Sequence, residues 1–437
     1  MTPPESAASA AAAQRSVLKQ LWGTVPRPLF SGGNVLRLLR GGDEMFPAMV
    51  EAIAAARHEV LLATYIFHDD PAVEKVAQAL LDAVQRGVQV KLVIDGFGTL
   101  GAVSALHRRL CDGGVQVAVF RPIDRWGNWL QPGQLRRMHL KLCVVDAETG
   151  FVGGVNLIDD RFDLSHGWTD APRLDFAVQT SGPVVGPIHE AAMAVWSRAH
   201  LGQAFKEEAI ALARGAEPLA RLRRLVKRLR LPGRKEMQAL PGTPSPMQAA
   251  FVLRDNVRQR RTIERAYIDA IRAARTRVDL ISPYFYPGRQ FRRALRHAAG
   301  RGVQVRLLLQ GKIDYRIAGL AARALYDELL GQGVHIFEYT PAYLHAKIAL
   351  VDDDWATVGS SNIDPLSLLL NLEANVIVRD AAFSAELSAQ LEAAIAVSAQ
   401  IDPTQKYRPG MLGALRRGVV AWVSYVYLRV AGATGRY

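Results

Sequence analysis

The chain contains the stretch HLKLCVVDAETGFVGGVN at positions 139–156 and, 206 positions later, the stretch HAKIALVDDDWATVGSSN at positions 345–362. Both follow one pattern, His-x-Lys-x4-Asp-x6-Gly-(Gly/Ser)-x-Asn, with every shared residue at the same place. A single histidine near a lysine is usually an accident of composition, but chance does not preserve this register twice. The chain therefore carries two halves of one site.

Each copy predicts a strand that presents a histidine and a lysine together. Residues two apart in an extended chain point to the same side, so His139 projects with Lys141, and His345 projects with Lys347. The four residues after each lysine form a continuous apolar run, which is typical of strands buried on both faces. We expect both pairs to lie on core strands and to face one ligand.

The aspartate of each motif follows its apolar run, where the chain enters a turn. Asp146 begins the segment DAETG and Asp352 begins the segment DDDW, and both segments have the composition of turns. A structural role is therefore the first expectation for these two carboxylates, although both belong to the repeated motif. The predicted catalytic set is His139, Lys141, Asp146, His345, Lys347 and Asp352.

The repeated motif resembles the signature of the phospholipase D superfamily, whose members pair two such motifs, and the resemblance extends from about Leu36 to about Asp402. Further stretches, among them WATVGSSNIDPLSLLLNLEAN at 355–375, are similar to bacterial cardiolipin synthases of the B type. The resemblance implies an α/β fold of two pseudo-symmetric phospholipase D-like domains. Each domain is expected to be a mixed sheet flanked by helices, with the active site in the cleft between the domains.

The rest of the sequence agrees with two similar α/β halves. The segment RGVQVKL at 86–92 is echoed by RGVQVRL at 301–307, and Ala-rich helical stretches alternate with Val/Leu-rich strands in both halves. The predicted division is a disordered N-terminal segment (1–32), a first domain (33–205), a basic amphipathic linker (206–245), a second domain (246–402) and a C-terminal membrane-interfacial segment (403–437).

Phosphodiester chemistry needs a nucleophile for phosphorus, donors for the phosphoryl oxygens and an acid for the departing alcohol. The resemblance implies that one histidine attacks to form a phosphohistidine, while the other protonates the leaving group and then deprotonates the incoming alcohol. By analogy His139 is the nucleophile and His345 the acid, but the symmetry of the sequence leaves the reverse open. Asn156 and Asn362, with the two lysines, are expected to bind the substrate phosphate.

An acid downstream of each motif is expected to orient its histidine. The superfamily has such an acid on a strand about thirty residues beyond the motif, and a carboxylate commonly fixes the second ring nitrogen of a catalytic histidine. Asp175 and Glu373 each interrupt a hydrophobic strand, which is unusual for an ordinary core position. We expect Asp175 to pair with His139 and Glu373 with His345.

The sequence predicts neither a metal site nor a cofactor. The motif histidines are accompanied by lysine rather than by the carboxylates or thiolates that hold metal ions. The chain has two cysteines, too few for a disulfide framework, and Cys143 within the first motif is expected to be a small apolar filler.

Charge and hydrophobic pattern indicate an anionic membrane surface as a partner. The formal net charge is +13, and residues 219–231, LARLRRLVKRLRL, form a basic amphipathic helix pattern. A solvated helix between the domains is the alternative. The apolar stretch at 418–428 is shorter than the roughly 20 residues that span a bilayer, so we expect it to lie at the interface or to pack as a terminal helix. These features predict peripheral attachment to a bacterial cell membrane.

The reaction implied by the resemblance is transfer of a phosphatidyl group from one phosphatidylglycerol to another, which gives cardiolipin and glycerol. The same chemistry fits a phospholipase D-type hydrolase, or a transphosphatidylase that uses another alcohol or lipid donor. A nuclease is the rival from another substrate class. Because the basic residues occur with apolar helical faces rather than in a broad polar patch, no nucleic-acid partner is expected.

Overall fold

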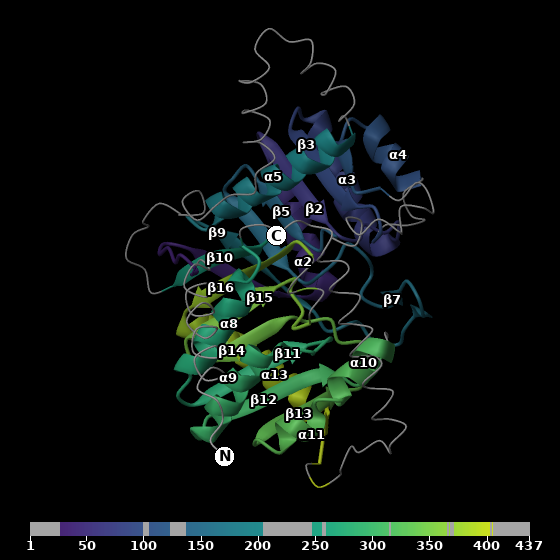
Figure 1. Cartoon of the computed structure of the whole chain (residues 1–437). Helices are drawn as coiled ribbons and strands as arrows, with labels where there is room; N and C mark the ends of the chain where they lie inside the picture. Colours follow the sequence, from purple (N-terminus) through teal and green to yellow (C-terminus); the bar gives the residue numbers. More distant parts are fainter. Residues whose placement is uncertain are drawn as a thin grey trace, which may run out of the picture.

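The computed structural model describes residues 27–98, 105–122, 137–203, 247–255, 259–313, 316–364, 367, 371–402 and 404. These residues form two α/β halves, which are coloured purple to blue and green to yellow in Figure 1. The predicted linker at 206–245 lies outside the described residues, as does nearly all of the predicted C-terminal segment at 403–437.

The first half contains one seven-stranded mixed sheet, in the order β1-β9-β6-β5-β2-β3-β4. Its strands are β1 (Val35–Arg40), β2 (Glu59–Thr64), β3 (Gln89–Asp95), β4 (Gln116–Phe120), β5 (Leu142–Val145), β6 (Thr149–Gly153) and β9 (Phe176–Ser181). Its helices are α2 (Gly41–Ala55), α3 (Pro71–Gln85), α4 (Ala105–Asp112) and α5 (Val185–Gln203). A separate hairpin joins β7 (Phe162–Asp163) to β8 (Gly167–Trp168).

The second half contains an eight-stranded mixed sheet, in the order β10-β16-β15-β14-β11-β12-β13-β17. Its strands are β10 (Gln248–Arg254), β11 (Arg277–Ser282), β12 (Gln304–Gln310), β13 (Val334–Tyr339), β14 (Ile348–Val351), β15 (Trp355–Gly359), β16 (Glu373–Arg379) and β17 (Ala399–Gln400). Its helices are α8 (Thr262–Ala273), α9 (Arg289–Gly300), α10 (Arg316–Arg323), α11 (Tyr326–Leu330) and α13 (Ala381–Ala396).

The two sheets repeat one topology. Strand β2 pairs in parallel with β3, and β3 with β4, while the remaining neighbours in the first sheet are antiparallel. The second sheet has the same sequence of parallel and antiparallel pairs from β10 to β13, and adds β17 at its edge. The prediction of two pseudo-symmetric mixed sheets flanked by helices is confirmed.

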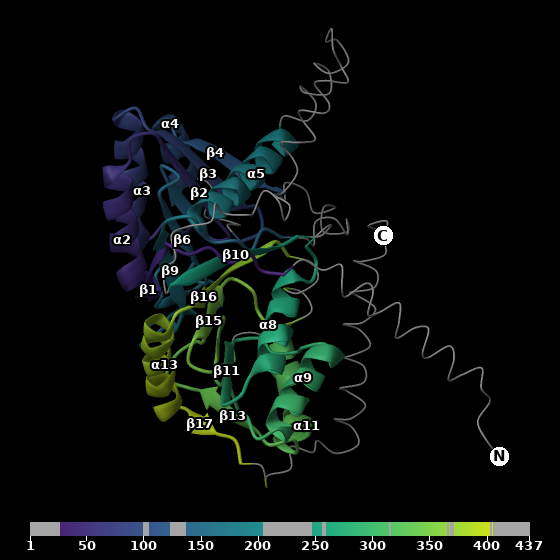
Figure 2. The same cartoon turned by 90° about the vertical axis from the view of Figure 1, so that its left-hand side faces the viewer.

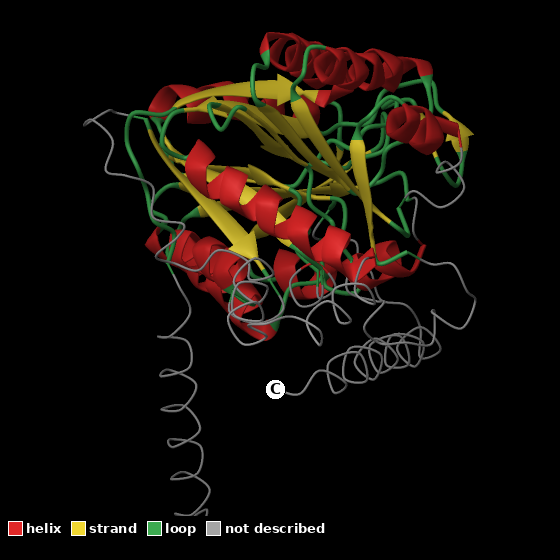
Figure 3. Ribbon diagram, turned by 90° about the horizontal axis from the view of Figure 1, so that it is seen from above, coloured by secondary structure: helices red, strands yellow, loops and turns green. Residues whose placement is uncertain are grey.

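Helices cover both faces of the sheets, as the views in Figures 2 and 3 show. Helices α2 and α3 pack with one face of the first sheet in one apolar core, and α8 and α9 do the same in the second half. A third core is shared between the halves and contains residues of α5 and α13, such as Val195 and Leu387, with the facing strands. The two halves are therefore joined by a continuous apolar core, which fixes their relative position.

Residues 27–32, expected to be part of a disordered segment, instead lie against the second half. Phe30 packs on the core of that half, and the backbone groups of Ser31 and Ala249 form a reciprocal pair of hydrogen bonds of 2.9 and 3.0 Å. The chain then enters β1 of the first half. The crossing gives the backbone of Ser31 hydrogen-bond partners on a strand of the second half. The polar and Gly-rich composition of this segment does not predict such strand pairing.

Candidate active site

Each motif histidine lies just before a strand of its own half and is bonded to the other half. Strands β5 and β14 begin at Leu142 and Ile348, so the His-Lys pairs precede the strands on which they were expected. The His139 amide donates to the carbonyl of Leu372 at 3.0 Å, and the His345 amide donates to the carbonyl of Leu174 at 2.9 Å. These pairings hold both extended segments in the cleft between the halves.

The carboxylate partners of the histidines are exchanged between the halves. His139 Nδ1 lies 3.0 Å from Glu373 Oε2, and His345 Nδ1 lies 2.6 Å from Asp175 Oδ2. The predicted pairing of Asp175 with His139 and of Glu373 with His345 is therefore wrong. The physical reason is the backbone hydrogen bonding between the halves. Leu174 and Leu372 each accept from the histidine of the opposite half, and the acid is the next residue in the chain.

The two lysines lie beneath the histidines and are almost fully buried, with Lys141 3% and Lys347 1% exposed. Each ammonium donates to the carbonyl of its own motif histidine. Burial and then the charge of Lys347 lower the pKa of Lys141 to about 7. Two buried lysine charges that repel each other favour the binding of an anion, because an anion would offset both their desolvation and their mutual repulsion.

The histidines respond to the same field. Burial lowers the pKa of His139, and the two lysine charges lower it further, while Glu373 opposes the shift. Burial, followed by the charges of Lys347, Arg173 and Lys141, holds the pKa of His345 well below its usual value. The side chains of His139 and His345 remain 12% and 18% exposed, so a substrate can reach both rings.

Asn156 and Asn362 occupy equivalent buried positions beside the motifs. Each lies three residues after the glycine that ends its motif strand, β6 or β15, and is about 5% exposed or less. The side-chain oxygens of both are buried and lack a hydrogen-bond partner in the described part of the chain. These oxygens can accept a hydrogen bond from a hydroxyl or another donor, whereas the Nδ2 groups are the atoms that can donate to a phosphoryl oxygen.

Asp146 and Asp352 lie at the far ends of β5 and β14 and do not join this cluster. Asp146 accepts hydrogen bonds from the amides of residues 57–59, and Asp352 accepts from the amides of residues 275–277. Both have positive φ angles, 51° and 53°, which an aspartate tolerates in a turn. Their inclusion in the catalytic set is therefore not supported by the geometry, whereas the expected structural role agrees with it.

The residue that follows the first glycine of each motif differs between the halves, and this difference matches the different lengths of Asp175 and Glu373. A Cβ atom on Gly154 would lie 2.3 Å from Asp175 Oδ1, so glycine there leaves room for the shorter acid. The equivalent residue, Ser360, donates a 2.6 Å hydrogen bond to Glu373. The Gly/Ser alternative in the repeated motif thus matches the Asp/Glu alternative on the neighbouring strand.

Three further residues around His139 were not predicted as a group. Asp95 is fully buried, accepts from the Met138 amide at 2.9 Å, and lies 3.7 Å from the guanidinium of Arg137. Burial raises the pKa of Asp95 to about 6, and Arg137 opposes this. The Tyr65 ring meets His139 edge to face, with 4.9 Å between the ring centroids, and has the Lys141 ammonium 5.3 Å from its centre.

One feature of the sequence could have pointed to Asp95. This carboxylate ends the buried parallel strand β3, and functional groups commonly lie at the carboxyl ends of parallel strands.

Among the described residues, no cluster of three or more His, Cys, Asp or Glu side chains is arranged to hold a metal ion. In the same part of the chain, no helix has the length and apolarity needed to cross a bilayer.

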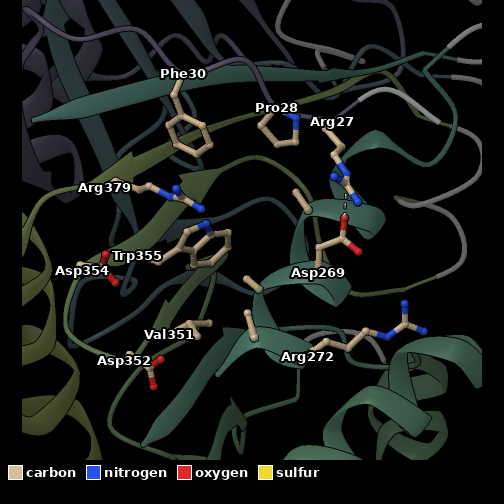
Figure 4. Close-up of a pocket in the computed structure, with 13 residues that line it drawn as sticks. Arg27, Pro28, Phe30, Asp269, Arg272, Val351, Asp352, Asp354, Trp355 and Arg379 are labelled. Atoms are coloured by element: carbon tan, nitrogen blue, oxygen red, sulfur yellow. Dashed lines mark ion pairs between the residues drawn. The ribbon is translucent and has the colours of Figure 1, made fainter. Parts of the chain in front are cut away.

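A cavity of about 720 Å³ lies away from the histidines. It is lined by the N-terminal residues 27–30, α8 and the β14–β15 turn, which is the Asp352 end of that hairpin. Figure 4 shows Arg27 paired with Asp269, and Arg379 beside Phe30, with 4.7 Å between the guanidinium carbon and the ring centre. The cavity does not include any histidine, lysine or asparagine of the two motifs.

Comparison with known proteins agrees with the repeated motif and the fold. A family model described as "Cardiolipin synthase, PLD-like domain" matches residues 49–167 and 267–395. Cardiolipin synthase B of Salmonella typhi is 38% identical over 364 residues, covering 83% of this chain and 81% of that protein. Cardiolipin synthase B of Escherichia coli K12 is 36% identical over 383 residues, covering 85% and 83%.

A solved structure shares the fold. The phosphatidylserine synthase of Haemophilus influenzae Rd KW20 matches with a TM-score of 0.63 over 95% of this chain and 99% of its own, at 13% identity. At that identity the likeness bears on the fold alone. The family model and the relatives together establish that the chain belongs to the cardiolipin synthase family of phospholipase D-like proteins.

Proposed function

We propose that this protein is a phosphatidyltransferase that joins two phosphatidylglycerol molecules into cardiolipin and releases glycerol. The observation that carries the proposal is the pair of histidines, each bonded to a carboxylate of the opposite half, above two buried lysines. This arrangement supplies both the reacting groups and the positive charge that a phosphodiester needs. The relatives named cardiolipin synthase B support the choice of lipid substrate.

In the first step of the proposed reaction, one imidazole attacks the phosphorus of the donor lipid through its Nε2 atom. A bond from nitrogen to phosphorus forms, and the bond from phosphorus to the glycerol oxygen breaks. The second histidine, as imidazolium, gives its proton to the departing glycerol. The carboxylate on the Nδ1 side of each ring fixes its orientation and stabilises the charged form as it develops.

In the second step, the neutral second histidine takes the proton from a hydroxyl of another phosphatidylglycerol. That oxygen attacks the phosphohistidine, the nitrogen–phosphorus bond breaks, and cardiolipin leaves with both histidines in their starting states. Lys141, Lys347, Asn156 and Asn362 are proposed to bind the phosphoryl oxygens in both steps. The resemblance assigns His139 as the nucleophile, whereas burial and the cations around His345 lower its pKa and favour the reverse assignment. The proposal therefore names the pair of reacting histidines and not which of them attacks.

We also propose that residues 33–205 and 246–402 act as the two domains and that neither half is active alone. The exchange of carboxylates supports this, because each histidine lacks its partner if the other half is removed. Peripheral association with an anionic membrane surface is proposed from the phospholipid substrate and the net charge of +13.

The test is to incubate the purified protein with phosphatidylglycerol vesicles in the presence of a chelator, and to follow lipids and glycerol by mass spectrometry. Cardiolipin formed with an equal amount of glycerol is the expected result. Phosphatidic acid without cardiolipin would instead identify a hydrolase that uses water as the acceptor. Absence of any lipid turnover, with cleavage of single-stranded DNA, would support a nuclease and contradict the proposal.

A further inference from the structure

The described part of the chain exposes few large apolar side chains, and three of them flank the active site. The large apolar residues on the surface are Val35, Phe97, Leu164, Trp168 and Val397. Leu164 and Trp168, 53% and 62% exposed, lie on the β7–β8 hairpin, and Phe97 follows β3. Scattered single apolar residues need no explanation, but a cluster beside a site suggests contact with an apolar partner.

The hairpin is braced rather than loosely attached. The Asp163 carboxylate accepts hydrogen bonds from the amides of Ser165 and His166, both at 2.9 Å, and closes the turn. Arg173 donates to the carbonyl of Phe162 at 2.9 Å and lies 3.7 Å from the Asp163 carboxylate. The polar groups of the turn are thus hydrogen-bonded within the protein, while Leu164 and Trp168 face outward. These two side chains form an apolar tip on the surface of the hairpin.

The hairpin also contacts the second histidine segment. The His166 ring lies 5.6 Å from the Tyr343 ring, and Tyr343 precedes His345 by two residues. Near the first histidine segment, the guanidinium carbon of Arg137 lies over the Phe97 ring, 5.4 Å from the ring centre. Arg137 precedes His139 by two residues. The hairpin, through His166, and Phe97 therefore contact equivalent positions two residues before the two histidines, which puts the hairpin and Phe97 on both borders of the site. Figure 1 shows β7 standing out near the junction of the halves.

We propose that Phe97, Leu164 and Trp168, called here the apolar rim, enter the interface of a phospholipid bilayer and hold the opening of the site against it. This inference rests on the proposed function, because a diacyl substrate keeps its acyl chains in the bilayer while its phosphate reaches the histidines. Tryptophan favours the boundary between headgroups and acyl chains, since its ring is apolar and its N–H is polar. A bilayer suits the apolar rim better than a protein partner because the substrate itself must arrive from a bilayer.

The test compares one substrate in two physical states. Turnover of phosphatidylglycerol is measured in vesicles, and also as the dihexanoyl lipid below its critical micelle concentration. In the double variant Leu164→Gln/Trp168→Gln, the ratio of vesicle turnover to monomer turnover is expected to fall at least about tenfold, the change that follows from loss of one large buried apolar contact. The matched control is Val35→Gln/Val397→Gln, which removes similarly exposed side chains elsewhere and should leave the ratio unchanged.

A second measurement does not depend on turnover. Quenching of tryptophan fluorescence by vesicles of brominated phosphatidylglycerol should be stronger in the intact protein than in Trp168→Phe, and Leu164→Trp should increase it. An unchanged turnover ratio in the double variant, or quenching that does not differ between the intact protein and Trp168→Phe, would overturn the inference. If the intact protein makes no cardiolipin from either lipid, the proposed function fails, and the quenching experiment still decides whether the apolar rim enters bilayers.

Discussion

The surroundings of His139 and His345 differ more than the backbone that carries them. Both histidines precede equivalent strands, bond to the opposite half and lie over a buried lysine. His139, however, has Glu373 with Ser360 behind it and the Tyr65 ring beside it, whereas His345 has Asp175 with Gly154 behind it.

The register of the repeat makes the second difference clear. Phe67 and Phe285 form equivalent bridges, to Leu157 and Ile363, so the place of Tyr65 is taken in the second half by Pro283. The aromatic stretches at 65–67 and 284–286 are therefore offset by one residue. By the same register, Asp95 at the end of β3 corresponds to Gln310 at the end of β12.

The two similar halves thus hold two identical side chains in unequal electrostatic environments. A nucleophile must be neutral when an acid must be protonated, so a double displacement needs the two imidazoles to differ. Glu373 opposes the lowering of the His139 pKa, while cations dominate around His345. The differences between the halves are thus as important for the mechanism as their similarity.

The largest effect should come from removing either histidine. His139→Ala and His345→Ala are each expected to lower cardiolipin formation by about 10⁴-fold or more, because both take part in one chemical sequence. Thermal unfolding should remain cooperative in both variants. His189→Ala is the matched control, since His189 belongs to neither motif and pairs with Glu59 at the start of β2. Near-normal activity in either catalytic variant would show that a two-histidine mechanism is wrong.

The exchanged carboxylates should give the next largest effect. Glu373→Gln and Asp175→Asn are each expected to lower kcat by about 100-fold or more, through loss of histidine orientation and charge stabilisation. In ¹⁵N spectra, Glu373→Gln should shift the ring nitrogens of His139 more than those of His345, and Asp175→Asn should do the reverse. The opposite pattern would mean that each acid serves the histidine of its own half.

Exchange of the residues behind the acids tests the difference between the halves directly. Gly154→Ser is expected to lower activity about tenfold or more, because the new side chain would force the Asp175 carboxylate to move. Ser360→Gly should have a smaller effect on activity, because it removes a hydrogen bond to Glu373 but adds no atom that would displace this carboxylate. Equal effects of the two changes on kcat would argue against the tight fit at Gly154.

Anion binding should depend on pH through Lys141. Because the pKa of this ammonium is lowered to about 7, it is charged below that pH and loses its charge as pH rises. Sulfate affinity, measured by titration calorimetry, should therefore fall about tenfold between pH 6 and pH 8. Lys141→Met should bind sulfate weakly at both pH values, while the exposed Lys75→Met should follow the intact protein. A flat profile in the intact protein would contradict the low pKa.

The smallest effect on catalysis is expected for the motif aspartates. Asp146→Ala should lower the free energy of unfolding by about 1–3 kcal/mol, because three backbone amides lose their acceptor, and should change kcat by less than about twofold. Burial raises the pKa of Asp146, but the hydrogen bonds from these amides together outweigh it and lower the pKa, so the stabilisation is present above about pH 4 and is lost as pH falls further. A large loss of kcat without loss of stability would restore Asp146 to the catalytic set.

The fold could be predicted from the sequence, and the residues proposed for the site could be named from it, because both depend on local or repeated patterns. The spacing of the two motifs, the apolar runs after Lys141 and Lys347, and the matching helices all appear in a single reading of the chain. The exchange of Asp175 and Glu373 could not be predicted in this way. It depends on which segments bond across the cleft, and the pairing of Met138 with Leu372 joins residues 234 positions apart.

Asp95 was missed for a related reason. It ends a strand of the first half and has no repeated counterpart, so a search for what the halves share passes over it. Tyr65 was expected near the site from a supposed match between the aromatic stretches at 65–67 and 284–286, which the register of the bridges shows to be offset by one residue. The acid that ends β3 and the ring after β2 acquire meaning only when Arg137 and His139 are brought beside them. Repetition identifies the shared chemistry, whereas the tertiary structure identifies what distinguishes the two histidines.

The most direct test of the two-histidine account is to trap the intermediate. The protein is mixed with phosphatidylglycerol, quenched in alkali within milliseconds to seconds, digested, and mapped by tandem mass spectrometry. The account predicts a phosphorus-containing adduct on the peptide with His139 or His345, which disappears when that histidine is replaced by alanine and forms much more slowly when the other is replaced. Cardiolipin formation without an adduct on either histidine, or with an adduct on another residue, would contradict it.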